Sequence, residues 1–280
     1  MQGCGGGGDN NDTSVSNGGG NTSTTAPGDN GGGTTTPSGG NTGTGGSGSG
    51  GADQGSVSAP FARGDASNYI LLTPLGKSWG PLSSSTQAAD GAMTALNDTQ
   101  LSGDYAVQNI VGDANFVIGR WVQGTVTTAT GADTLTGTDG RAYHYIAYQA
   151  LSTFPDGSLH CTGGNFTTPT YTGGGGSAAQ IGTATGTADI VFSDGSGALT
   201  GSMTVSANNQ TATVPFPTTL ASPTSMPLTG QYLSPNGVGS GVRLADAGNG
   251  AYALVVQFAA VTPSGARYIG VGRLPCTSSN

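Results

Sequence analysis

The sequence predicts an all-β fold, an antiparallel meander that forms a barrel or a two-sheet sandwich with at most one or two short helices. The chain has no Glu, and Lys77 is its only lysine, so two of the good helix formers are nearly missing. Thr, Val, Tyr and Ile, which suit a half-buried pleated surface, recur instead through the later part of the chain. Turn dipeptides separate these segments at short intervals, which favours hairpins.

Residues 1–58 are expected to form a disordered lipoprotein tether, and residues 59–280 a single antiparallel β domain. Between residues 4 and 57 there is no aromatic residue, no Leu or Ile and no positive charge. Such a segment cannot bury enough apolar surface to offset the entropy lost on ordering. As a flexible coil of about 55 residues, its ends would lie roughly 40 Å apart on average.

Ordered structure is expected from about Pro60. Trp79 is expected to anchor the turn after the first strand. One helix is predicted at 87–96, because this stretch is Ala-rich and Ser85 or Thr86 can cap it. The expected strands are 68–72, 105–111, 116–128, 142–154, 158–167, 183–192, 198–206, 210–215, 229–233, 241–245, 251–261 and 267–274.

The separators between these strands have the chemistry of hairpin turns. Asn, Asp and Gly tolerate the positive φ that tight hairpin turns require. These separators are Asp139-Gly140, Asp156-Gly157, Asp194-Gly195, Asn208-Asn209, Asn249-Gly250 and Ser264-Gly265.

The net charge of −8 argues against nucleic acid as a partner, because neutralising phosphates needs clustered Lys and Arg. The same deficit argues against a polybasic membrane patch. No apolar stretch approaches the roughly 20 residues of a membrane-spanning helix. Membrane attachment would therefore have to be covalent.

The N-terminus resembles that of a bacterial lipoprotein. Gly3-Cys4 and the glycines at 5–8 carry the resemblance, with the Gly/Asn/Thr/Ser tract behind them. The resemblance implies that a signal peptide is removed before Cys4, which is then diacylated on sulfur and acylated on its amine. Gly5 after the cysteine is similar to lipoproteins sorted to the outer membrane.

A second resemblance covers residues 183–280. The strand, Asp-Gly turn and strand between Asp189 and Val205 are similar to the barrel lobes of surface lipoproteins, such as the transferrin-binding and complement-regulator-binding proteins. Those proteins also hang an antiparallel barrel from a glycine-rich tether. The resemblance carries no ligand-binding motif to this chain.

Three cysteines in an exported protein usually mean one disulfide and one special thiol. We expect Cys161 to pair with Cys276, which leaves Cys4 for the lipid. Such a bond restricts the unfolded chain by roughly 4–5 kcal/mol in the entropy model. Two buried free thiols are the alternative.

No catalytic residue, cofactor or metal site is predicted. Nucleophilic catalysis usually needs a histidine base, and the chain offers only His144 and His160. His144 lies within an expected strand, where a packed imidazole is common, and His160 adjoins Cys161. The sequence Gly76-Lys77-Ser78 lacks the first glycine of a phosphate-binding loop.

Two further patterns each allow a functional and a purely structural interpretation. Calcium could bind near Asp189 and Asp194, or near Asp133 and Asp139, but aspartates in such turns usually serve the turn itself. The tripeptide at 63–65, Arg-Gly-Asp, spells an integrin-recognition motif, and tripeptides also occur by chance.

Aromatic residues give the remaining binding hypothesis. Tyr143, Tyr145 and Tyr148, with Trp121 and Tyr171, could line a concave binding face, since Tyr is favoured at interfaces. Packing in the core and on strand surfaces is the alternative.

The function expected from these observations is that of a non-enzymatic binding protein and antigen, lipid-anchored in the outer membrane. It would be surface-exposed or periplasm-facing, with a host or envelope protein as its partner. Two alternatives stay open: a hydrolase acting on glycans or other substrates, and an envelope scaffold. A deep cleft with two close Asp side chains, or His144 hydrogen-bonded to one, would distinguish the hydrolase.

Overall fold

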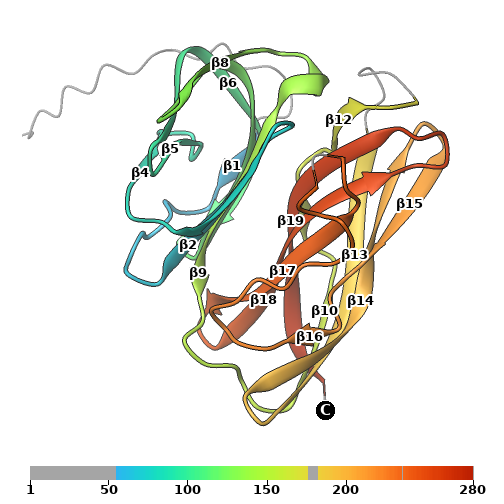
Figure 1. Cartoon of the computed structure of the whole chain (residues 1–280). Coiled ribbons are helices and arrows are strands. Elements are labelled where there is room, and N and C mark those ends of the chain that lie inside the picture. Colours follow the sequence, from blue (N-terminus) through green and yellow to red (C-terminus); the bar gives the residue numbers. More distant parts are fainter. Residues whose placement is uncertain (1–54, 176–181, 235, 280) are drawn as a thin grey trace, which may run out of the picture. The chain divides into compact units, whose positions relative to one another are not determined.

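The computed structural model describes residues 55–175, 182–234 and 236–279 (Figure 1). Within these residues the chain is almost entirely β-strand, with one short 3-10 turn, η1 (Asp139–Arg141), and no α-helix. Nearly all strand pairs are antiparallel, so the predicted fold class is confirmed. The predicted tether, up to residue 54, and Cys4 with it, lies outside the described residues.

The first group of strands is organised around β7 and β9. Its members are β1 (Gly55–Val57), β2 (Ser67–Leu72), β3 (Lys77–Pro81), β4 (Ser85–Gln87), β5 (Met93–Leu96), β6 (Thr99–Asp113), β7 (Phe116–Thr128), β8 (Gly131–Thr136) and β9 (Tyr143–Ala150). β9 pairs with β7 and with β2, and β7 pairs with β6 and β8. The short β1 pairs with β6 in parallel.

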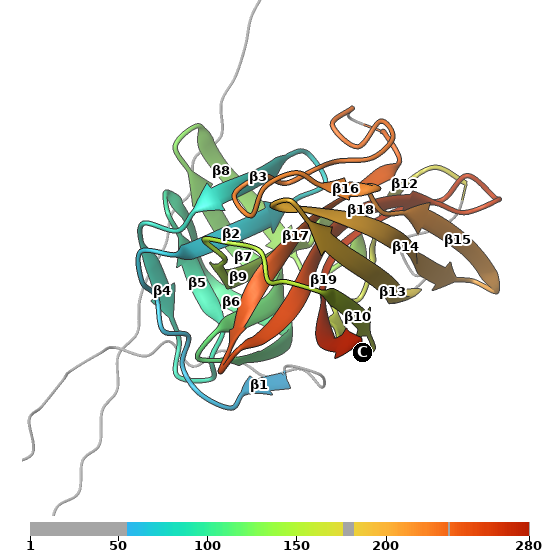
Figure 2. The ribbon, with the colours of Figure 1, turned by 90° about the horizontal axis from the view of Figure 1, so that it is seen from below.

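The second group is organised around β19. Its members are β10 (Ser158–Thr162), β11 (Asn165–Phe166), β12 (Thr170–Gly173), β13 (Gly182–Ser193), β14 (Ser196–Ala207), β15 (Gln210–Pro215), β16 (Thr219–Leu220), β17 (Gly239–Gly248), β18 (Ala251–Val261) and β19 (Arg267–Ser279). β19 pairs with β18 and, along its length, with β10, β11 and β12. Figure 2 shows β17, β18 and β19 side by side, as their pairing requires.

The two groups form one continuous sheet because β9 also pairs with β17, at Ala150 with Ala245 and at Gln149 with Asp246. Among the described residues this sheet does not close on itself. β3 pairs only with β2, and β15 only with β14, so both are edge strands there. Lys77 and Pro81 on β3 are residue types that discourage pairing at an edge.

Three apolar clusters make up the core, and one of them draws on both groups of strands. Ile70 on β2 and Ile146 on β9 pack in the same cluster as Val255 on β18 and Val271 on β19. Neighbouring residues on each strand point the other way, so Tyr145 lies in a cluster belonging to the first group alone. A third cluster fills the second group. The shared cluster fixes the first group of strands against the second.

Four of the six predicted hairpin turns join paired strands, Ser264-Gly265 between β18 and β19 among them. The other two predictions are wrong: Asp139-Gly140 precedes β9 and Asp156-Gly157 follows it, and β9 pairs instead with β2, β7 and β17. Three of the confirmed turns have two consecutive positive φ values. Asp194 and Gly195 have φ of 51° and 73°, Asn208 and Asn209 have 50° and 57°, and Asn249 and Gly250 have 54° and 75°. Two consecutive positive φ values are typical of the type I′ turn, whose twist matches that of the strands it joins.

The predicted helix at 87–96 is wrong: this stretch forms the hairpin of β4 and β5. Gly91 has a φ of 93°, which favours glycine and breaks a helix. Asp90 accepts a hydrogen bond from the backbone N–H of Ala92 through its side chain and so stabilises the turn. The Ala-rich composition was therefore less informative than the Asp-Gly pair within it.

Three other expectations need correction. The predicted strand at 229–233 is a turn, since Gly230 has a φ of 58° and Tyr232 donates its N–H to the carbonyl of Thr229. The predicted strand at 158–167 is interrupted at Gly163 and Gly164, both with positive φ. Trp79 lies within strand β3 and not in a turn.

Candidate functional site

The three tyrosines proposed as a binding face lie in the core. Tyr143 and Tyr145 pack with Trp121 on one face of β9, and Tyr148 points to the shared cluster on the other. Tyr145 accepts a hydrogen bond from the N–H of Met93, and burial raises its pKa. Burial and the neighbouring Asp133 raise the pKa of Tyr143 to about 12. All three side chains are buried, so this structure offers no face that they could present to a ligand.

His144 is a buried, hydrogen-bonded core residue. Its Nδ1 lies 2.7 Å from the hydroxyl of Thr167, and its Nε2 lies 2.8 Å from that of Thr170. Arg120 is also in contact with Thr170. Burial, and then the charge of Arg120, hold the pKa of His144 well below its usual value of 6.5. The imidazole is therefore neutral at physiological pH, and its two recorded partners are hydroxyls rather than carboxylates.

The neutral His144 predicts a loss of stability in mild acid. Below pH 6.5 the unfolded chain binds a proton at His144 that the folded chain does not bind. The free energy of unfolding should therefore fall by about 1.4 kcal/mol per pH unit from this group as the pH drops. Urea unfolding at pH 7.5, 6 and 5 measures the slope. Because glutamine cannot titrate, the unfolding free energy of His144→Gln should depend on pH less steeply than that of the wild type, by the contribution of one proton. Equal pH dependence in the two proteins would contradict the assignment.

His160 forms an exposed pair with Asp189. The two residues face each other on β10 and β13, with 2.6 Å between Nδ1 and Oδ1. Their side chains are 45% and 65% exposed, on an open strand surface. Exposed pairs of this kind contribute little to stability.

Cys161 and Cys276 form the predicted disulfide. They stand opposite each other on β10 and β19, so the bond ties two paired strands together. Both residues are buried in the cluster of the second group. The alternative of two free thiols is wrong.

Two of the four aspartates considered for calcium, Asp133 and Asp189, have protein partners. Asp133 contacts Arg141 and accepts a hydrogen bond from Tyr143, while Asp189 contacts His160. Asp194 lies in its turn, and the side chain of Asp139 lies outside the described part of the chain. Within the described ranges, no three His, Cys, Asp or Glu side chains gather where they could hold a metal ion. The tripeptide at 63–65 is exposed, and Arg63 donates a hydrogen bond to the carbonyl of Ser83.

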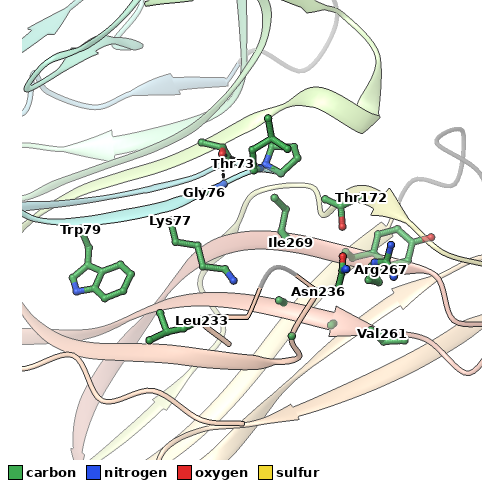
Figure 3. Close-up of a pocket in the computed structure, with 16 residues that line it drawn as sticks. Thr73, Gly76, Lys77, Trp79, Thr172, Leu233, Asn236, Val261, Arg267 and Ile269 are labelled. Atoms are coloured by element: carbon green, nitrogen blue, oxygen red, sulfur yellow. Dashed lines mark hydrogen bonds between the residues drawn. The ribbon is translucent and has the colours of Figure 1, made fainter. Parts of the chain in front are cut away.

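The strongest candidate site is a groove that the sequence did not reveal (Figure 3). Its volume is about 480 Å³. Four separate parts of the chain line it: the turn from β2 into β3 with the first residues of β3, strand β12, the loop before β17, and the facing ends of β18 and β19. We call it the hairpin groove, and its lining residues are Thr73, Pro74, Leu75, Gly76, Lys77, Trp79, Thr172, Leu233, Asn236, Gly237, Ala259, Ala260, Val261, Arg267, Tyr268 and Ile269.

Lys77 joins two walls of the hairpin groove. Its ammonium group donates hydrogen bonds to the backbone carbonyls of Tyr232 and Ser234 and lies 4.4 Å from the centre of the Tyr232 ring. Tyr232 is itself buried and donates its hydroxyl to Gln257 on β18. Lys77 therefore holds the loop before β17 against strand β3.

The rim of the hairpin groove is unusually apolar. Leu75 is 88% exposed and Leu233 is 65% exposed. They are two of only four large apolar side chains that are exposed in the described residues, the others being Val191 and Val238. In the turn that carries Leu75, the hydroxyl of Thr73 accepts hydrogen bonds from the N–H groups of Leu75 and Gly76. A short hydrogen-bonded turn thus holds an apolar residue out into water.

Sequence reasoning missed this groove because its walls are distant along the chain. In the sequence, Lys77 stands out only as the single lysine, within a Gly-Lys-Ser sequence that does not fit a phosphate-binding loop. The one unusual sequence feature of the groove is that it contains Lys77, the only lysine of the chain.

Comparisons with protein-family models, curated proteins and solved structures found no match to this chain. In the part of the chain that the structure describes, no helix has the length and apolar character needed to cross a membrane.

Proposed function

We propose that this chain is a non-enzymatic binding protein, held at the outer membrane by a lipid on Cys4, whose hairpin groove receives the ligand. The β domain from residue 59 is the binding part, and residues 1–58 are the tether. A host or envelope protein is the partner class, and surface display would make the domain an antigen. The observation that carries the binding role is the groove with its exposed rim.

The rim supports this role through its energetics. Soluble proteins usually scatter exposed apolar residues singly, and apolar patches beside a hollow mark binding sites. Leu75 and Leu233 lie on the rim of the same groove, although they are 158 positions apart in the sequence. Covering a leucine side chain fully is worth about 1.5–3 kcal/mol. A ligand that covers both would therefore gain substantially from the rim alone.

The placement of the histidines agrees with a non-enzymatic role. His144 is enclosed between two threonines, and His160 lies on an open strand surface beside Asp189. Neither of them lines the hairpin groove.

The anchor is tested by Cys4→Ser. We expect the wild-type chain to fractionate with the outer membrane and the variant to be released, because the lipid on Cys4 is the membrane attachment in this proposal. Mass spectrometry of the wild-type chain should find the acyl groups on Cys4. Treatment of intact cells with protease then measures display. If the domain is cleaved only after the outer membrane is breached, it lies on the periplasmic side.

The binding role is tested by capture of partners from host serum and envelope extracts. The double variant Leu75→Ser and Leu233→Ser should lower capture at least about tenfold, since each 1.4 kcal/mol lost is a factor of ten. Val191→Ser is the matched control, because Val191 is 57% exposed on β13 and lies outside the groove. Equal loss in both variants would contradict a binding role for the groove.

A further inference from the structure

The charges of the hairpin groove are opposite in sign to those of the whole chain. The net charge of the chain is −8, yet the charged residues of the lining are Lys77 and Arg267, with no acidic residue among the described ones. The groove therefore holds two of the seven Lys and Arg side chains of the chain. Such a local reversal favours an anion in the groove and disfavours one elsewhere on the surface.

Among the described residues, no acidic side chain forms an ion pair with Lys77. Its recorded hydrogen-bond partners are backbone carbonyls, which are neutral. Burial lowers its pKa, since the ammonium has lost part of its hydration. An anion bound nearby would stabilise the charged form of Lys77 and so offset the hydration that the ammonium loses on burial.

Arg267 offers a donor without a partner. Its Nε is buried and has no hydrogen-bond partner in the described part of the chain. Its guanidinium lies beside Gly173, where a Cβ would come within 3.0 Å of Nη2. A buried donor left unpaired is unfavourable, and a guanidinium is well suited to bind a carboxylate. In Figure 3 Arg267 lies toward one end of the groove, Trp79 toward the other, and Lys77 between them.

The other side chains of the groove are suited to an apolar body. Trp79 is half-buried in strand β3, and Ile269 lies on the facing wall. Leu75 and Leu233 add the exposed rim. A volume of about 480 Å³ lies within the range of small-molecule sites, about 300–1,000 Å³.

We propose that the hairpin groove binds a small organic acid, with its carboxylate held by Arg267 and Lys77 and its apolar body against Trp79, Leu75 and Leu233. This inference rests on the proposed binding role of the same groove and names the chemistry of the ligand. A free acid and an acidic group on the proposed partner protein are two sources of this same chemistry, a carboxylate beside an apolar group. The probes below test the free acid, and capture from the extracts tests the protein.

The probes are 4-phenylbutyrate and its neutral amide, 4-phenylbutanamide, titrated into the full chain by calorimetry. The acid should bind at least about tenfold more tightly than the amide, because a charge-assisted hydrogen bond is roughly twice as strong as a neutral one. Arg267→Gln should weaken binding of the acid about tenfold and leave binding of the amide unchanged. Arg267→Lys, which keeps the charge, should recover part of the affinity.

Arg63→Gln is the matched control, because it removes the same charge from an exposed arginine that lies outside the groove. It should leave both affinities unchanged. Lys77→Gln should also weaken binding of the acid. Because Lys77 holds the loop before β17, circular dichroism of this variant checks that the domain is still folded. Equal affinities for acid and amide, or equal losses in Arg63→Gln and Arg267→Gln, would overturn the proposal.

The two proposals fail separately. If the acid does not bind but the rim variant still loses its captured partner, the ligand class is wrong and the binding role stands. If neither the probes nor the extracts give groove-dependent binding, both are wrong.

Discussion

Replacing Cys161 and Cys276 together by Ala should lower the free energy of unfolding by roughly 4–5 kcal/mol. The bond joins residues 115 apart in sequence, so its loss frees a long loop in the unfolded chain. It also removes the covalent link between β10 and β19. Because proteins are typically stable by only about 5–15 kcal/mol, this single bond accounts for a large share of the total.

Urea unfolding with and without a reducing agent measures this effect. The reductant should destabilise the wild-type chain by a similar amount and leave the double variant unchanged. A loss below about 1 kcal/mol in the double variant would contradict the expectation, since it lies far under the usual range for a native disulfide.

Trp121→Ala should give the second large effect, a loss of about 3–5 kcal/mol. Trp121 is fully buried, and its indole N–H donates a hydrogen bond of 2.6 Å to the carbonyl of Met93. The N–H of the same residue, Met93, donates to Tyr145. The substitution therefore opens a cavity and leaves a buried carbonyl without its partner.

Trp79→Ala is the matched control, because Trp79 is the other tryptophan of the chain and only half-buried. Its loss should be less than half as large. Trp121→Phe should fall between wild type and Trp121→Ala, since it fills most of the cavity but cannot donate the hydrogen bond. Chemical unfolding of the four proteins tests the order, and an equal loss at both tryptophans would contradict it.

The features that sequence predicted well are those decided by neighbouring residues. The turn at Asn249 and Gly250 needs two residues that tolerate positive φ, and both are visible in the sequence. The disulfide also needed little geometry, since Cys161 and Cys276 are the only two cysteines outside the N-terminal tract. The predicted helix at 87–96 is wrong because the turn at Asp90 and Gly91 outweighs the helix propensity of the Ala-rich stretch around it.

The candidate groove could not be predicted because its geometry depends on contacts far apart in sequence. Lys77 meets the carbonyl of Tyr232 from 155 residues away, and nothing local to either residue indicates this contact. The tyrosines of β9 were considered for binding because aromatic residues are common at interfaces. Only the packing of core clusters against both faces of β9 shows that these side chains are enclosed.

The central position of β19 has a consequence for the order in which the molecule can assemble. Strands β10, β11 and β12 all pair with β19, whose residues are synthesised about a hundred positions later. Until then one edge of β10 has no partner, and unpaired strand edges invite wrong pairing. Folding dominated by such distant pairings is slow. Strands β13, β14 and β15 can pair with one another as the chain emerges, but β10, β11 and β12 can complete their pairing only after β19 has been synthesised.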